Sequence, residues 1–471
     1  FFMLPTSNNT IITDETDGLP MPRRIWAVVS IGFALCMSVL DVNIINIVLP
    51  TLSHDFGTSP ATTTWIINGY QLAIVVSLLS FASLGEIIGY RKVYLSGIAL
   101  FCVTSLLCSL SDSFWTLTIA RVFQGFSASA ITSVNTAQLR FVYPKSQIGR
   151  GMGINAMVVA ISAAAGPSVA SGILAIADWH WLFAINVPLG IIALSLGIKN
   201  LPRQENKTKR KFDTISAVAN AICFGLLIYT LDGLAHHENR DYLALQVIVL
   251  VGVSVFYVRR QLKETTPLLP LDLLKIPIFR LSIMTSICSF IAQMGAMVSL
   301  PFFLQNALGH SEVMTGLLLT PWPLATLITA PLAGYLVERI HPGILGSIGM
   351  VLFGLGLFSL SMLTPESSDI SIILRLMLCG AGFGLFQTPN NSTIISSAPP
   401  ARSGGASGML GMARLLGQTF GTTLVALIFS HVVSDRSTAV CLLFGSGFAM
   451  LAAIVSSLRI SQPSVLEKEK L

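Results

Sequence analysis

The chain of 471 residues is too hydrophobic for a water-soluble protein. Hydrophobic residues make up 53% of it, charged residues only 11%, and the mean hydropathy is +0.75, whereas soluble domains carry about 25% charged residues. The net charge of +6 calls for no nucleic-acid partner, because basic residues also collect in the loops of membrane proteins. The apolar runs have the length of membrane helices and lack the alternating ten-residue pattern of an outer-membrane barrel. We therefore expect an all-α polytopic membrane protein.

Polar breaks divide the apolar sequence into runs that predict fourteen membrane-spanning helices. In chain order, we expect the spans at 25–49, 62–84, 93–110, 114–137, 151–173, 181–198, 214–232, 242–258, 279–302, 313–336, 343–363, 370–392, 405–430 and 438–458.

The distribution of lysine and arginine supports this number of spans. Both termini and every second connection hold 23 of the 28 basic residues. The opposite connections hold only Arg240 and Arg436, and Arg121, Arg375 and Arg414 fall inside spans. Because positively charged loops stay in the cytoplasm, we expect both termini there.

A repeated pattern divides the chain into two halves. Glu86 precedes Arg121 by 35 residues, and Glu338 precedes Arg375 by 37. Transporters are often built from repeated halves, so we expect spans one to six to correspond to spans nine to fourteen. The predicted segments are a cytoplasmic lead (1–24), an N-terminal six-helix bundle (25–200), basic linkers with two inserted helices (201–277), a C-terminal six-helix bundle (278–460) and a cytoplasmic tail (461–471).

The first span contains the stretch LDVNIINIVLP, residues 40–50. A charged side chain near the bilayer centre costs about 2.5 to 3.5 kcal/mol on insertion scales, and Asp41 is the one carboxylate that we place deep in a span. On a helix, Asn43 and Asn46 lie about 60° apart, with Asp41 about 140° to 160° from both. The span therefore has two polar faces. Asp41 either exchanges a proton or is permanently ionised and paired with an arginine.

Four stretches together resemble the major facilitator superfamily, and within it the fourteen-helix drug:proton antiporters of the quaternary ammonium and viologen efflux type. They are LDVNIINIVLP, RVFQGFSASA in span four, GPSVASG in span five and WHWLFAINVPLG at 179–190. The resemblance implies two six-helix bundles plus two inserted helices, and with the absence of long loops it predicts a bacterial inner membrane as the location. No HExxH, GxSxG or Walker motif accompanies them, so we expect no enzymatic activity. We also expect no cofactor, because the proton gradient would drive transport.

The resemblance also implies roles for particular residues. Asp41 and Arg121 would couple transport to protons. Conformational or gating roles fall to Gly153, Gly166 and Pro167 in span five and to Glu86, Gly89, Arg91 and Lys92 after span two. The alternatives are that Arg121 binds backbone carbonyls, that the span-five residues serve ordinary packing, and that Arg91 and Lys92 only set topology.

Large polarizable side chains predict a substrate cavity, because aromatic walls attract cations without strict geometry. The candidates are Asn43, Trp65, Tyr70, Phe126, Trp322, Phe386 and Gln387. The family implies lipophilic cations as cargo, such as quaternary ammonium compounds, viologens, dyes and biguanide antiseptics, exported by a monomer in exchange for protons. The alternative is a proton-coupled transporter of a physiological solute such as a polyamine, sugar or lipid precursor.

Overall fold

The computed structural model describes residues 18–144, 147–203, 212–235, 240–264, 267–337, 339–399, 402–432 and 434–460. Most of the predicted cytoplasmic lead, the whole predicted tail at 461–471 and Glu338 of the predicted repeat lie outside these residues.

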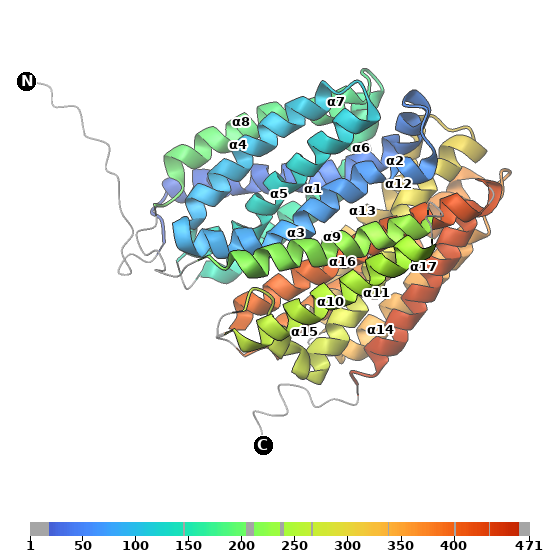
Figure 1. The fold of residues 1–471 in the computed structure, drawn as a ribbon. Coiled ribbons are helices and arrows are strands. Elements are labelled where there is room, and N and C mark those ends of the chain that lie inside the picture. Colours follow the sequence, from blue (N-terminus) through green and yellow to red (C-terminus); the bar gives the residue numbers. More distant parts are fainter. Residues whose placement is uncertain are drawn as a thin grey trace, which may run out of the picture.

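The described residues fold into helices (Figure 1). Their bounds are α1 Arg23–Asp55, α2 Pro60–Thr63, α3 Trp65–Ile88, α4 Tyr90–Ser109, α5 Phe114–Val142, α6 Ile148–Leu174, α7 His180–Ala184, α8 Asn186–Asn200, α9 Thr214–Ala235, α10 Arg240–Lys263, η2 Leu271–Lys275, α11 Pro277–Phe302, η3 Phe303–Ala307, α12 Glu312–Leu319, α13 Pro321–Leu336, α14 Pro342–Ser361, α15 Asp369–Ser397, α16 Ser403–His431 and α17 Ser434–Ser457.

Twelve helices in the described ranges are long and apolar enough to cross a membrane, so the chain is a multi-pass membrane protein. Each of the fourteen predicted spans coincides with a helix. The two beyond the twelve are α5, in which residues such as Arg121, Gln124 and Gln138 reduce the hydropathy, and α9, whose described apolar stretch Thr214–Thr230 is shorter. Three predicted spans are broken near one end, at Thr64, Ile185 and Thr320.

Helices α1 to α8 pack mainly against one another and form the N-terminal half, and α11 and α13 to α17 do the same in the C-terminal half. Helix α12, which leads into α13, packs mainly on α6 of the N-terminal half. Because lipid tails are as apolar as leucine, close packing of small residues holds such helices together. Gly349 of α14 faces Gly382 of α15 so closely that an added Cβ would lie 2.7 Å from the Gly382 carbonyl oxygen. Gly125 of α5 packs similarly on α3, where an added Cβ would lie 2.8 Å from that of Ala73.

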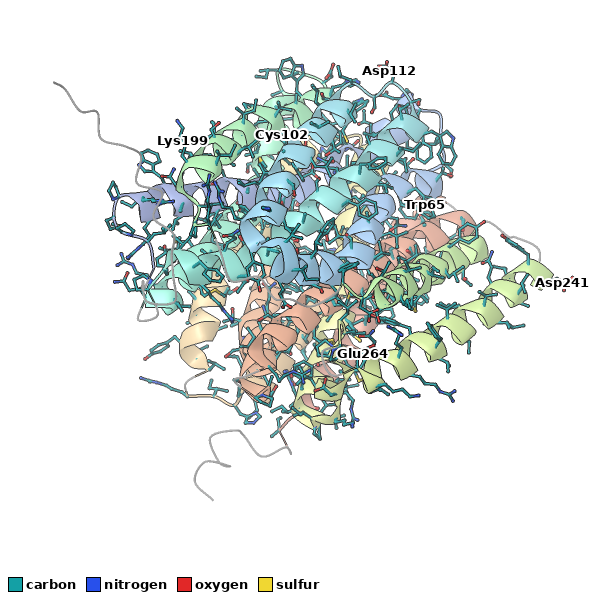
Figure 2. The ribbon with its side chains drawn as sticks, turned by 60° about the vertical axis from the view of Figure 1, so that its left-hand side comes forward. Trp65, Cys102, Asp112, Lys199, Asp241 and Glu264 are labelled. Atoms are coloured by element: carbon teal, nitrogen blue, oxygen red, sulfur yellow. The ribbon has the colours of Figure 1, made fainter. Side chains whose placement is uncertain are left out.

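The inserted helices α9 and α10 lie beside the seam between the two halves. Helix α9 contacts α3 of one half and α16 of the other, and α10 packs on α9. Figure 2 shows α10 at the periphery, with Asp241 near one end and Glu264 near the other. The side-chain amide of Asn220 in α9 donates a hydrogen bond of 3.0 Å to the Val76 carbonyl of α3. The pair is therefore attached to the N-terminal half by a polar contact.

Polar contacts between the halves gather near one end of the molecule. We name the end at which α1, α4 and α11 begin the basic end, after Arg23, Arg91 and Arg280, and the other the far end. Near the far end, Gln305 donates to the Ile47 carbonyl at 2.7 Å, Ser171 donates to the Val313 carbonyl at 2.9 Å, and Thr51 hydrogen-bonds Glu312.

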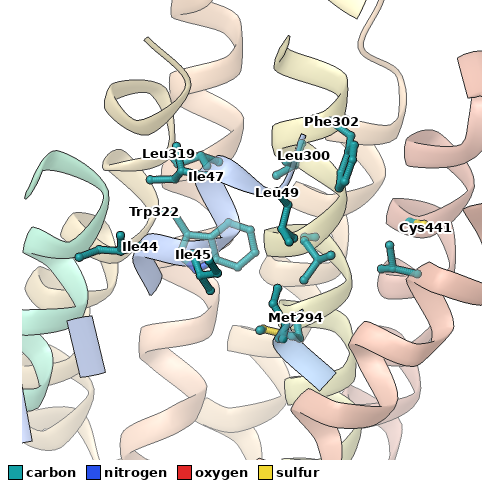
Figure 3. Packing of buried hydrophobic residues seen from close by; sticks show 14 of the residues in the cluster. Ile44, Ile45, Ile47, Leu49, Met294, Leu300, Phe302, Leu319, Trp322 and Cys441 are labelled. Atoms are coloured by element: carbon teal, nitrogen blue, oxygen red, sulfur yellow. The ribbon is translucent and has the colours of Figure 1, made fainter. Parts of the chain in front are cut away.

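Apolar side chains fill the space beside these polar contacts. Figure 3 shows Ile44, Ile45, Ile47 and Leu49 of α1 in one cluster with residues of the C-terminal half, which are Met294, Leu300 and Phe302 of α11, Leu319 of α12, Trp322 of α13 and Cys441 of α17. All of these side chains are buried. The two halves are therefore packed together without a polar channel through this cluster.

Candidate functional site

Asp41 and Arg121 form a buried ion pair inside the N-terminal half. A guanidinium nitrogen of Arg121 on α5 contacts a carboxylate oxygen of Asp41 on α1, and the two side chains are 0% and 1% exposed. Gln124 and Asn186 donate hydrogen bonds of 3.0 and 3.3 Å to the other carboxylate oxygen. Charged groups are stable away from water only when they are paired and hydrogen-bonded in this way. Asp41 thus has partners on both oxygens.

Gln124 connects the pair to further helices. The side-chain oxygen of Gln124 accepts a hydrogen bond of 2.7 Å from Arg121. Its side-chain nitrogen donates to Asp41 and, at 2.9 Å, to Ser105 of α4. With Asn186 at the start of α8, the network joins four helices: α1, α4, α5 and α8. The sequence analysis did not single out Gln124, Asn186 or Ser105, although the first two lie in stretches that carried the family resemblance. Their signal was a polar residue within an apolar span.

Tyr70 lies on the side of Arg121 that faces α3. The guanidinium carbon is 4.1 Å from the centre of the Tyr70 ring, a cation–π contact. Arg121 also donates from Nε to the Ile66 carbonyl at 3.4 Å, and its Nη2 has no partner among the described residues. Arg121 therefore binds both a carboxylate and a backbone carbonyl. The pairing of Arg121 with Asp41 agrees with the alternative in which Asp41 stays ionised. If Asp41 carries a proton, this ion pair must also break during transport.

The sequence model of the Major Facilitator Superfamily matches residues 31–422, a range that contains this network and most of both halves. The chain belongs to the Major Facilitator Superfamily.

Three curated relatives of this major facilitator protein differ in what their names say. "Uncharacterized transporter YebQ" of Escherichia coli K12 is 56% identical over 95% of this chain and 98% of its own. "Riboflavin transporter RibZ" of Clostridioides difficile is 29% identical over 87% of this chain and 89% of its own. "Multidrug resistance protein Stp" of Mycobacterium tuberculosis is 29% identical over 87% and 77%. The chain is a membrane transporter, and these names do not agree on a cargo.

Two of the three predicted gating residues of span five lie in tight contacts of the major facilitator fold. An added Cβ on Gly166 would lie 2.9 Å from the Cβ of Asn43 on α1, and one on Gly316 of α12 would lie 2.9 Å from the Pro167 carbonyl oxygen. Gly153 is exposed, and an added Cβ there would meet nothing within 4 Å. Helix α6 thus contacts both α1 and the C-terminal half through its second half.

The predicted gating residues after span two lie at the basic end. Gly89, with φ of +102°, separates α3 from α4 in a conformation that favours glycine. Arg91 donates to the Ile198 carbonyl at the end of α8, at 2.6 Å, while Glu86 and Lys92 are exposed. The contacts described for these side chains stay within the N-terminal half.

The predicted cavity residues do not all come together. Tyr70 lies beside Arg121, and Trp322 is buried in the cluster between the halves (Figure 3). Asn43 donates to the Val39 carbonyl of its own helix at 2.7 Å. Phe386 is buried within the C-terminal half, where its ring packs against Phe383. Trp65, Phe126 and Gln387 are half-buried.

The remaining intramembrane arginines have different partners. Arg375 donates to the Ser359 carbonyl. Arg459, placed by sequence just beyond the last span, is 1% exposed and donates to Asn390 and Ser282 at 2.7 and 3.0 Å. Arg414 lies over the ring of Phe290, 5.7 Å from its centre. The sequence singled out Arg375 and Arg414 and missed Arg459.

Proposed function

We propose that this protein is a proton-coupled exporter that works by alternating access. The observation that supports this most is the Asp41–Arg121 pair, because a buried carboxylate held by an arginine and two amides can change the packing of four helices when it takes up a proton. The two bundles are residues 25–200 and 278–460, and the insert is 201–277. Arg121 is the residue that controls the proton affinity of Asp41.

The transport cycle follows from the contacts between the halves. In our proposal the basic end faces the cytoplasm of a bacterial inner membrane and both termini lie there, so contacts such as Gln305 to Ile47 close the periplasmic side. In this state, closed on the periplasmic side, Asp41 is paired with Arg121. After the switch to the outward-facing state, a periplasmic proton neutralises Asp41 and releases Arg121. Cargo leaves, and the protonated carrier returns to give the proton to the cytoplasm.

The driving force depends on the charge of the cargo. One pH unit supplies about 1.4 kcal/mol per proton, and about 100 mV supplies about 2.3 kcal/mol per net charge moved. Exchange of one proton for a monovalent cation is electroneutral, so only the pH difference drives it. The gating residues in this cycle are Gly166 and Pro167, where α6 meets α1 and α12, with Gly153, Glu86, Gly89, Arg91 and Lys92 serving the opening at the basic end.

The first cargo class is the lipophilic cations expected from the sequence, in keeping with the name of Stp. The second is a physiological solute, in keeping with the name of RibZ, and one observation favours it. Asp41 is already neutralised by Arg121, while Arg414 has no carboxylate partner among the described residues. The centre of the protein thus carries an excess positive charge, which disfavours a simple cation. We propose no catalytic activity, no cofactor and a monomer.

Proteoliposomes with an imposed pH gradient test this proposal. The parent protein should move an aromatic cargo against its gradient when the pH gradient is applied, and Asp41→Asn should bind the same cargo without gradient-driven movement. Asp112→Asn is the matched control, because Asp112 is an exposed carboxylate between α4 and α5 and its loss should leave transport intact. Equal transport by Asp41→Asn and the parent would refute the role of Asp41.

A further inference from the structure

Arg414 lies at the seam between the two halves, near the middle of α16. Two contacts place this part of α16 along α3 of the other half. Thr422 hydrogen-bonds the side-chain carbonyl of Gln71 at 3.4 Å, and an added Cβ on Gly411 would lie 3.6 Å from a methyl group of Leu78. Arg414 falls between these two positions. Arg414 therefore lies on the stretch of α16 that borders the seam between the halves.

The charge of Arg414 is not balanced within the described parts of the chain. The side chain is half-buried and makes no hydrogen bond or ion pair there; its contact is the ring of Phe290. By contrast, Arg121 has Asp41, Arg375 has the Ser359 carbonyl, and Arg459 has Asn390. Arginine does not lose its proton at physiological pH. A permanent cation inside a membrane needs an anion, a dipole or water.

Two further hydrogen-bond donors, on the part of α3 that lies along α16, lack acceptors. The hydroxyl of Tyr70 and the side-chain nitrogen of Gln71 are both buried, each residue being 1% exposed, and neither has a partner in the described structure. Tyr70 and Gln71 are neighbours on α3, and Gln71 accepts a hydrogen bond from Thr422, two turns beyond Arg414 on α16. Buried polar groups are normally hydrogen-bonded. One cation and two donors thus flank the seam without an acceptor.

We propose that Arg414 binds an acidic group of the cargo, with Tyr70 and Gln71 donating hydrogen bonds to the same molecule. A carboxylate or phosphate matches the guanidinium, and an aromatic body matches the ring of Phe290 beside it. The cargo is then an amphipathic organic acid or zwitterion. This inference rests on the proposed transport function, and it replaces the lipophilic cation with a molecule of opposite or balanced charge.

A pair of dyes that differ at one group tests the inference. One is a rhodamine with a free carboxylate, and the other is its methyl ester, which is a simple cation. Binding to the purified full-length protein should be about tenfold tighter for the carboxylate dye. Arg414→Gln should remove this preference while Arg375→Gln, which alters an arginine bound to a carbonyl, should retain it. Arg414→Lys should restore part of it. A thermal unfolding scan confirms that each variant is folded.

Three results would overturn the inference: equal or tighter binding of the ester by the parent, an unchanged preference in folded Arg414→Gln, or an equal loss of preference in folded Arg375→Gln. Transport of the two dyes separates this failure from a failure of the proposed function. If a pH gradient moves the ester and not the carboxylate dye, the exporter stands and the acid site is wrong. If the gradient moves neither dye although the carboxylate dye binds through Arg414, the acid site stands and proton-coupled export is wrong.

Discussion

The packing of α12 on α6 gives a prediction about which side of the transporter is open. An added Cβ on Gly316 would lie 2.9 Å from the Pro167 carbonyl oxygen, which belongs to backbone that cannot rotate away. Gly316→Val therefore destabilises the state in which the far end is closed. Overpacking a tight contact costs about 1 to 3 kcal/mol, so the equilibrium between closed and open should shift by about 5-fold to about 150-fold.

Spin labels at His54 and Ser311 can measure this shift, since both are exposed at the far end, one in each half. In a background without the native cysteines, the distance distribution between the labels should move to longer values in Gly316→Val. Gly172→Val on α6 is the matched control, because an added Cβ there meets nothing within 4 Å. An unchanged distribution in Gly316→Val, or the same shift in Gly172→Val, would refute the reasoning.

Three more predictions concern other parts of the molecule. Gln124→Leu removes the hydrogen bonds with Asp41 and Arg121 and should lower the free energy of unfolding by about 1 to 3 kcal/mol. Thermal unfolding in detergent measures this change, and no loss would show that the network does not depend on Gln124. Arg459→Gln should cost a similar amount, because bonds to a charged donor are lost, while exposed Arg436→Gln should cost nothing, and equal effects would contradict the assignment. The pKa of Asp213 responds to burial, which raises it, but hydrogen bonds from Ser216 and Arg260 outweigh this and lower it. Its contribution to stability is therefore full above the unfolded pKa of about 3.9 and is lost as the pH falls through the lower folded value, so unfolding of the parent and Asp213→Asn should differ at neutral pH and converge in acid.

The spans could be predicted from the sequence because each is a local run of apolar residues of fixed minimum length. The contact of Asp41 with Arg121 could be anticipated as well, since Asp41 is the only deep carboxylate in the predicted spans and needs a partner. The breaks at Thr64, Ile185 and Thr320 were not foreseen. They fall where a short helix such as α2 continues into the next with slightly altered backbone, and the apolar pattern is the same on both sides.

The partners of single polar side chains could not be read from spacing. Arg459 looked like a basic residue beyond the last span, but α17 ends so that this side chain reaches Asn390 and Ser282 on two other helices. Phe386 had the size and chemistry of a cavity residue, yet it packs on Phe383 inside the C-terminal half. Both outcomes depend on how helices far apart in the sequence are rotated against each other, which a hydropathy pattern does not encode.

The central claim is that uptake of a proton by Asp41 leads to release of the cargo, and the pH dependence of cargo binding tests it most directly. The affinity of the purified parent for the carboxylate rhodamine should rise from mildly acidic to mildly alkaline pH, and binding in the acidic range should release a proton into weakly buffered solution. Folded Asp41→Asn should bind with an affinity independent of pH and release no proton, while Asp112→Asn should behave as the parent does. The same pH dependence and the same proton release from Asp41→Asn would contradict the account.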